Sequence, residues 1–378
     1  MNTNLGRTAY FDNIRIALII LVLMHHVGQA YGPTGGWWAY QEPERTRILN
    51  IFFAVNRSFF MSLFFFISGY FMPGAYDRKG PAKFLADRFK RLGIPLLVFC
   101  LAIIPVLHYC YFLNFRHYGY IGFFEYYRNF WLGLGVKPAD WSGPAWPEFN
   151  FAQLWFIEHL LIFTCVYTLW RMIRNSSPGR KMDAPIPKTW QIVTFSLIVM
   201  AVCAVVRIPY PIDKWIGFLG FIQVAFADVP RDLGWFIIGV LAYRNNWIER
   251  FPARSGFAWL CVGIGLSILY SVTAWFKVFP YPLFVLWETF LCTGFCIGFM
   301  VLFREKINGS NRLSVEMGLC TYGVYLFHVP VLVIFQYMFA GVHAGPLVKF
   351  AGVSVIATVV TFAFTAVLRR LPLAREIL

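Results

Sequence analysis

The feature that most restricts the fold of this chain is a series of apolar runs, each of about 20 residues, the length that an α-helix needs to cross the hydrocarbon core of a bilayer. Only 13% of the residues are charged and 59% are hydrophobic, too few charges to cover a soluble globule of 378 residues. We therefore expect an all-α, polytopic membrane helix bundle, with 1–378 as a single integral-membrane domain. The nine runs are 14–31, 50–72, 93–113, 151–173, 189–208, 255–276, 283–303, 318–340 and 347–368.

Between the fifth and sixth runs lie two shorter apolar pieces. They flank a polar cluster that is formed by Asp228, Arg231 and Asp232. We interpret 231–244 as a short span and 215–227 as a partial or re-entrant helix, because neither piece has the length of a full crossing. The expected total is then about ten transmembrane helices.

The lysine and arginine residues predict the orientation of the helices. If the N-terminus is cytoplasmic, 21 of the 33 Lys and Arg residues fall in inside segments and nine in outside segments. Cytoplasmic loops of membrane proteins carry such an excess of positive charge. We expect an N-in, C-in, multi-pass protein of the inner (cytoplasmic) membrane, surrounded by the lipid bilayer. The inside charges are Arg7 and those in 73–92, 171–188, 244–254, 304–312 and 369–375.

The same pattern narrows the classes of partner. The net charge of +15 follows mainly from the topology, so we do not expect a nucleic acid as partner. The eight cysteines fall mostly within apolar runs and lack the spacing of metal ligands, so we expect no bound metal. The long outside segment 114–150 is rich in aromatic residues, and we expect an ordered lid or an interfacial helix near 121–132.

The first apolar run holds several ionisable residues. Asp12, Arg15, His25 and His26 lie in or against it, where a charge near the bilayer centre costs about 2.5 to 3.5 kcal/mol. Arg15 and His26 share one helical face within about 20° and are about 16 Å apart along the axis. His25 points about 80° away from Arg15. The alternatives are a hydrogen-bonded core histidine at His26 and an interfacial anchor at Arg15, paired with Asp12.

Other ionisable residues lie at a similar depth. Counted along their spans, Arg57, Glu158 and Glu288 lie about 7 to 10 Å below the outer edge, near the levels of His26 and His328. We expect a polar cavity in the outer half of the bundle. The alternative for the first three residues is a set of structural ion pairs.

Together these residues resemble a known family. An arginine followed after ten residues by a histidine, as in Arg15 and His26, is similar to the signature of acyltransferase family 3. The Asp-x-Ile-Arg start, the Ser-Gly-Tyr-Phe and the Leu-Trp-Phe resemble the branch that succinylates periplasmic glucans. Four further stretches fit in the same order: FFFISGYFM (64–72), ADRFKRLGIPLL (86–97), QLWFIEHLLIF (153–163) and TYGVYLFHVP (321–330).

The resemblance implies an activity. An acyl group such as acetyl or succinyl would pass from cytoplasmic acyl-CoA to a hydroxyl of a cell-envelope glycan or other carbohydrate at the outer face. Acetyl-CoA or succinyl-CoA would be the donor. A histidine suits the role of general base, because its ordinary pKa is about 6.5.

The resemblance also suggests roles for single residues. We assign His26 as the base, with Glu158 as its partner in catalysis. Arg15, Arg88 and Arg91 would bind the CoA phosphates, to which guanidinium groups are well suited; the alternative is an unliganded basic loop.

The residues expected to bind the acceptor come from several of the apolar runs. Aromatic residues there are otherwise packing residues, and Ser68 lies beside Gly69, where close packing is the simpler interpretation. Tyr322 is a further candidate along the acceptor route. The expected substrate-binding residues are Arg57, His328, Trp155, Tyr325 and Glu288, and the expected supporting residues are Asp12 and Ser68.

Two other functions fit the same residues. A transporter or flippase for an anionic or glycan solute would use the polar layer as its binding site, although we find no inverted repeat. Alternatively, a separate protein at the outer face receives the acyl group. Release of free CoA from acyl-CoA distinguishes an acyltransferase from a transporter.

Overall fold

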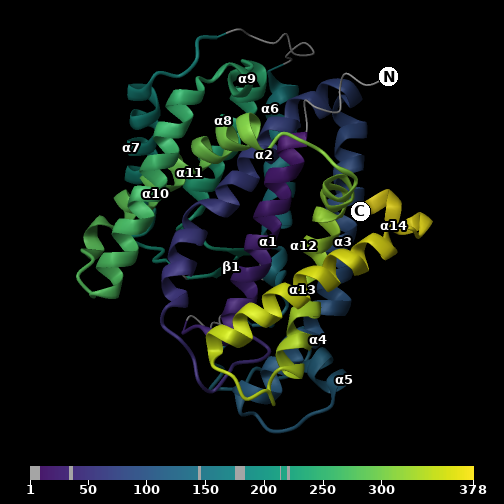
Figure 1. Ribbon diagram of the computed structural model, residues 1–378. Helices are drawn as coiled ribbons and strands as arrows, with labels where there is room; N and C mark the ends of the chain where they lie inside the picture. Colours follow the sequence, from purple (N-terminus) through teal and green to yellow (C-terminus); the bar gives the residue numbers. More distant parts are fainter. Residues whose placement is uncertain (1–8, 34–36, 144–145, 175–183, 213, 219–221) are drawn as a thin grey trace.

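The computed structural model describes residues 9–33, 37–143, 146–174, 184–212, 214–218 and 222–378 (Figure 1). These residues form α-helices joined by short π-helical or 3-10 turns, and one small hairpin. The helices are α1 (Ala9–Tyr31), α2 (Leu49–Arg88), α3 (Ile94–Val98), α4 (Ile104–Tyr111), α5 (Phe123–Tyr126), α6 (Trp155–Ile173), α7 (Thr189–Val206), α8 (Val229–Arg244), α9 (Trp247–Arg250), α10 (Ala253–Trp275), α11 (Phe284–Lys306), α12 (Arg312–Met338), α13 (Pro346–Leu368) and α14 (Pro372–Ile377). The shorter elements are η1 (Phe89–Gly93), η2 (Phe99–Ile103), η3 (Phe112–Arg116), η4 (Tyr127–Trp131), η5 (Ala152–Leu154), η6 (Tyr281–Leu283), β1 (Ile216–Phe218) and β2 (Ile222–Val224).

The helices confirm a multi-pass membrane bundle but divide the spans differently from the expectation. Within the described residues, eight helical segments are long and apolar enough to cross a membrane. One of them, Leu49–Arg116, extends over 68 residues and contains two expected spans, 50–72 and 93–113. The expected short span 231–244 corresponds to α8, whose 16 residues fall below the length of a full crossing.

The expectation of a partial helix at 215–227 is wrong. β1 and β2 pair antiparallel there, with Ile216 opposite Val224 and Gly217 opposite Gln223. β-branched residues favour strands, and Gly217 is a poor helix former. A short apolar run does not distinguish the two structures. Residues 219–221 of this region lie outside the described part.

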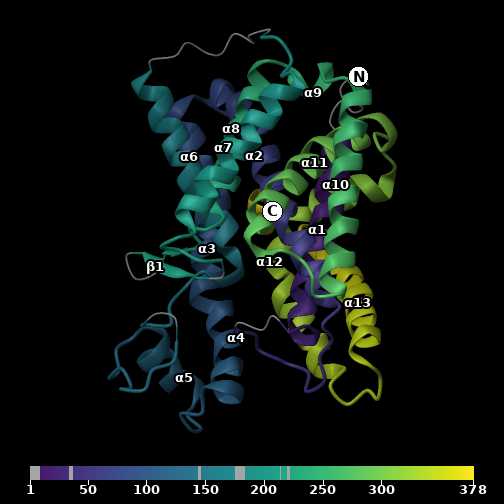
Figure 2. The same ribbon diagram turned by 90° about the vertical axis from the view of Figure 1, so that its left-hand side faces the viewer.

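The bundle has two ends, which Figure 2 shows at the top and bottom of the view. α9 lies at the end where the described chain begins, and α5 lies at the opposite end beyond α4. We call these the inner and outer ends, after the orientation that the charges predict. That orientation stays a prediction, and Arg7 and 175–183 lie outside the described residues.

α1 lies at the centre of the packing. It contacts α2, α11, α12 and α13, and most of its apolar residues are buried. Figure 1 shows α1 between α2 and α12. Other helices surround α1 on several sides, and burying an ionisable side chain without a partner costs free energy. The ionisable residues of α1 must therefore find partners on the neighbouring helices.

α2 and α8 approach each other closely through two glycines. A Cβ atom on Gly69 would lie 2.1 Å from the carbonyl oxygen of Phe236, and one on Gly239 would lie 2.1 Å from that of Phe66. Only glycine permits this approach of two backbones. Ser68, on the same turn of α2, is half-buried.

Two helical carbonyl groups lack their usual backbone N–H donor, because the residue four positions later is a proline. In each case a tyrosine hydroxyl donates the hydrogen bond instead. Pro95 has no N–H for the carbonyl of Arg91, which accepts a hydrogen bond from the Tyr322 hydroxyl. The Leu101 carbonyl, four residues before Pro105, accepts one from the Tyr127 hydroxyl at 3.0 Å. These bonds connect α12 to η1 and η4 to η2.

The outer segment 114–150 is described except for residues 144–145. It contains α5 and η4, which lie within the helix expected near 121–132, and a position at the membrane interface stays a prediction. Glu148 accepts hydrogen bonds from Arg116 at 2.9 Å and from the Tyr126 hydroxyl at 2.6 Å. Burial raises the pKa of the Glu148 carboxyl, while the Tyr126 hydroxyl and the Arg116 charge oppose that shift.

Candidate active site

The two adjacent histidines of α1 face different neighbours. His25 packs against aromatic residues of α2, with ring centroids 4.9 Å from Phe53 and 5.3 Å from Phe60. His26 faces α12, where its ring centroid lies 4.8 Å from that of His328. The two rings lie edge to face with their centroids 6.0 Å apart, but they face different helices, as the angular separation along a helix predicts.

Hydrogen bonds indicate the tautomer of His26. His26 Nδ1 lies 2.9 Å from the Val22 carbonyl oxygen and 3.2 Å from Nε2 of His328. His328 Nδ1 lies 2.7 Å from the Tyr325 carbonyl and must donate to it, so a neutral His328 accepts at Nε2. With two acceptors facing it, His26 Nδ1 carries the proton. The lone pair of a neutral His26 is then on Nε2, for which the described residues provide no hydrogen-bond partner.

An indole group holds the other side of the His26 ring. Trp38 stacks on it at 5.9 Å between ring centroids. The Trp38 Nε1 donates to Gln336 at 2.8 Å, and the Gln336 Nε2 donates to the Val27 carbonyl at 3.1 Å. Sequence reasoning missed Gln336, a buried polar residue within the apolar run of α12, which is itself a signal of a specific partner.

Glu158 is buried, but it does not contact His26. Both of its carboxyl oxygens lack a hydrogen-bond partner among the described residues. Cys100 and Tyr325 lie within electrostatic range of it. A hydrogen bond that orients His26, as expected for Glu158, is therefore not formed in this structure.

The three arginines expected to bind phosphate lie together at the inner end. Arg88, at the end of α2, is within electrostatic range of both Arg15 and Arg91. Arg15 also forms the expected ion pair with Asp12, at 3.1 Å. Its guanidinium lies over the Phe71 ring at 4.8 Å, and its side chain remains 32% exposed. An anion can therefore reach a cluster of positive charge here.

The C-terminal helix borders this arginine cluster. Arg91 Nε donates to the Ile377 carbonyl at 3.4 Å, and Lys90 pairs with Glu376 of α14. Tyr322 donates to the Arg91 carbonyl. Tyr322 therefore lies at the inner end, away from the acceptor route for which the sequence suggested it.

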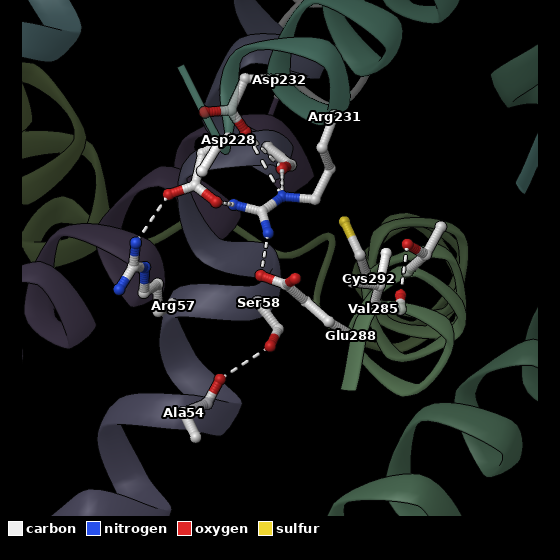
Figure 3. A network of polar contacts seen from close by, with 12 residues as sticks. Ala54, Arg57, Ser58, Asp228, Arg231, Asp232, Val285, Glu288 and Cys292 are labelled. Atoms are coloured by element: carbon white, nitrogen blue, oxygen red, sulfur yellow. Dashed lines mark hydrogen bonds and ion pairs between the residues drawn. The ribbon is translucent and has the colours of Figure 1, made fainter. Parts of the chain in front are cut away.

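A buried ion network connects α2, α8 and α11, and Figure 3 shows it from close by. Asp228 accepts from Arg57 at 2.9 Å and from Arg207 at 3.1 Å. Arg231 reaches Asp228 on one side and Glu288 on the other. The Asp232 carboxylate also belongs to the network, because it lies beside Arg231 and accepts a hydrogen bond from Ser62 at 2.6 Å. With Asp232 included, the arginines and carboxylates named for the network are equal in number.

This network includes two residues expected at the acceptor end. Arg57 and Glu288 are both held in ion pairs, which agrees with the alternative of structural pairing. Arg207 pairs with Glu288 at 2.7 Å, although no pattern in the sequence identified it. The polar cluster of Asp228, Arg231 and Asp232 was visible in the sequence, but its partners were not.

The remaining expected residues lie near α6. The Tyr325 hydroxyl donates to the Gln153 carbonyl at 2.6 Å. Trp155 lies 5.4 Å from His159 and 6.1 Å from Trp215, between ring centroids. Tyr325 is therefore close to the histidine pair through His328, whereas Trp155 faces the hairpin side.

Comparisons with known proteins point to one family. A family model described as an acyltransferase domain matches residues 8–370. The chain is similar to glucans biosynthesis protein C of Escherichia coli strain SMS-3-5, with 29% identity over 246 residues, 63% of this chain and 58% of that protein. The protein of the same name in Escherichia coli strain K12 is 28% identical over 246 residues, with the same coverage of 63% and 58%. The alignment thus spans less than two thirds of these relatives. No solved structure matches the chain.

The match covers nearly the whole chain, including the arginine cluster, the histidine pair and the ion network. It agrees with the family that the order of the motifs suggested, and it favours acyl transfer over transport. The chain belongs to acyltransferase family 3 and is an acyl-transferring enzyme with several membrane-spanning helices.

Proposed function

We propose that this protein transfers an acyl group from acyl-CoA to a hydroxyl group of a cell-envelope carbohydrate, with His26 as general base. The observation that carries the proposal is the position of the His26 ring. Its Nδ1 is occupied by Val22 and His328, so Nε2 holds the lone pair that a base requires.

The reaction needs one proton transfer and one exchange of bonds. As the acceptor hydroxyl oxygen attacks the thioester carbonyl carbon, His26 Nε2 takes the hydroxyl proton. The new C–O ester bond forms, the C–S bond breaks, and the proton passes from His26 to the departing CoA thiolate. A positioned base of this kind contributes a factor of about 10² to 10⁴ in rate.

The donor would enter from the inner end. Arg15, Arg88 and Arg91 supply guanidinium groups that suit the phosphate oxygens of CoA. Arg15 and His26 are about 16 Å apart along the axis of α1, a distance that the extended pantetheine arm of CoA would cross. The arginine cluster thus supports acyl-CoA as the donor.

The acceptor side takes its support from the relatives. Their name, glucans biosynthesis protein C, suggests a glucan as the acceptor. We place His328 and Tyr325 beside the reacting groups and Glu158 near the acceptor. Trp155 lies further out, and Arg57 and Glu288 support the site through the ion network. Acetyl and succinyl groups are the two candidate acyl groups.

The test compares two neighbouring histidines. Purified protein in lipid nanodiscs receives acetyl-CoA or succinyl-CoA and a glucose oligosaccharide, and both the released CoA and the acylated sugar are measured. We expect His26→Gln to lower turnover at least about 100-fold, because an amide cannot accept the proton. His25→Gln is the matched control, since His25 packs against α2 and takes no part in the reaction.

Size-exclusion profiles and melting temperatures show that each variant is folded. A folded His26→Gln variant with wild-type turnover would refute the mechanism. A wild-type protein that moves solute across the membrane of sealed vesicles and releases no CoA from either donor would indicate the transporter instead.

A further inference from the structure

We propose that His108, Trp131, Gln153 and Glu158, here called the outer polar group, bind the carbohydrate acceptor. This inference rests on the proposed function and adds a binding site to it. The four residues come from α4, η4, η5 and α6, at the outer end of the bundle.

The outer polar group is buried but has no hydrogen-bond partners for its functional atoms. The exposed fractions of His108, Trp131, Gln153 and Glu158 are 4%, 0%, 5% and 4%. Among the described residues, no partner exists for either His108 nitrogen, the Trp131 Nε1, either terminal atom of Gln153 or either Glu158 oxygen. An unsatisfied buried polar atom costs about 1 to 3 kcal/mol, so proteins normally provide a partner, a water molecule or a ligand.

On one side, a chain of contacts connects the outer polar group to His26. Trp38 stacks on His26, and the adjacent Trp37 stacks on His108 with ring centroids 3.9 Å apart. His108 in turn lies 5.2 Å from Trp131, between ring centroids. Trp37 and Trp38, whose ring centroids are 6.0 Å apart, thus connect the proposed base to His108.

On the other side, a second chain of contacts returns to the histidine pair. The Cys100 thiol donates to the Asn150 carbonyl at 3.2 Å and lies within electrostatic range of Glu158. Tyr325 donates to the Gln153 carbonyl and accepts from His328, which contacts His26. Gln153 is therefore connected to the histidine pair through its backbone, and we infer that its side chain and that of Glu158 face the same acceptor as His108 and Trp131.

The chemistry of these atoms selects a hydroxyl-rich ligand. Gln153 and His108 can both donate and accept, Trp131 only donates, and an ionised Glu158 only accepts. Sugar hydroxyls donate and accept in the same way, and sugar C–H faces pack on aromatic rings such as Trp37. A phosphate would meet the acidic Glu158 here, whereas the arginine cluster at the inner end suits it.

The experiment replaces the polar atoms by apolar groups of similar shape. We expect His108→Phe, Gln153→Leu and Trp131→Phe each to raise the KM for a glucose oligosaccharide about 5- to 150-fold, as expected from the loss of about 1 to 3 kcal/mol of hydrogen bonding. The KM for acyl-CoA should stay within twofold. The matched control is Trp247→Phe, because the Trp247 Nε1 on α9 is also buried and unpartnered but lies at the inner end.

A second readout is stability without substrate. Removing unsatisfied polar atoms should leave the melting temperature unchanged or raise it, a result that a structural role would not produce. Binding of the oligosaccharide to the inactive His26→Gln protein, measured by calorimetry, should weaken in the double variants that carry Gln153→Leu or His108→Phe.

The outcomes separate the two proposals. If His26→Gln is inactive while the polar-group variants bind oligosaccharide like wild type, the acceptor site is refuted and the acyl transfer stands. If those variants also melt at lower temperature, structural water molecules occupy the group. If His26→Gln retains full turnover but Gln153→Leu weakens sugar binding, the acceptor site stands and the mechanism fails.

Discussion

At the level of single residues, the environment of His26 depends on His328. The two histidines are far apart in sequence and meet at 3.2 Å. His328 is fully buried, and its Nδ1 is occupied by the Tyr325 carbonyl. In the proposed mechanism, His328 therefore positions the His26 proton rather than taking part in the chemistry.

A pair of variants at this position tests the role. His328→Leu removes the acceptor at His26 Nδ1, and we expect kcat to fall about 10- to 100-fold with little change in the KM for acyl-CoA. His328→Gln keeps an oxygen that can accept, so it should retain most of kcat. The midpoint of the pH profile of kcat should move in the leucine variant alone. Equal losses in both variants would indicate a packing role.

At the level of elements, the contact between α2 and α8 determines the relative positions of two arginines of the ion network. α2 carries Arg57 and α8 carries Arg231, and both residues belong to the ion network. The helices approach closely because Gly69 and Gly239 face backbone carbonyl groups. Close packing and buried charge thus stabilise the same pair of helices, and a change in one disturbs the other.

Alanine substitution at these glycines should be costly. The added methyl group would meet a backbone oxygen at 2.1 Å, so we expect Gly69→Ala and Gly239→Ala to destabilise the protein by about 1 to 3 kcal/mol or more. Thermal melting in detergent, followed by size-exclusion chromatography, measures the loss. Gly265→Ala on α10 is the control, because nothing lies within 4 Å of the added atom. Wild-type melting of both α2–α8 variants would contradict the packing.

At the level of the whole molecule, the two ends of the bundle carry different chemistry. Exposed positive charge gathers around Arg88 and Arg91 at one end, and unpartnered neutral and acidic groups such as Gln153 lie toward the other. If the donor is cytoplasmic and the acceptor lies at the outer face, the end with Arg88 and Arg91 must face the cytoplasm and the end with Gln153 must face outward. The distribution of Lys and Arg predicts this orientation.

Cysteine labelling can check the orientation. Tyr120 is 84% exposed in the outer segment, and Leu313 is 68% exposed at the start of α12. We expect a membrane-impermeant maleimide to label Tyr120→Cys in spheroplasts and to label Leu313→Cys only after permeabilisation. The wild-type chain, with its own cysteines, provides the background. The reverse labelling pattern would contradict an N-in topology.

Local patterns in the sequence predicted several parts of the structure correctly. Helical periodicity separated His25 from His26, and the three-residue spacing of Asp12 and Arg15 predicted their ion pair. The apolar runs predicted most long helices. The hairpin at 215–227 was missed because a short apolar run fits a helix as well as a strand, and the choice depends on its surroundings.

The sequence by itself determined the membrane-spanning class, the family and the face of α1 that carries Arg15 and His26, because these follow from hydrophobic length, motif order and helical geometry. Only the tertiary structure decided what each polar side chain meets. The pairs of Trp38 with Gln336 and of Arg57 with Asp228 join residues 298 and 171 positions apart. The same packing left the side chains of Glu158 and Gln153 buried, without hydrogen-bond partners among the described residues. Such pairings depend on how helices dock, and no local spacing contains that information.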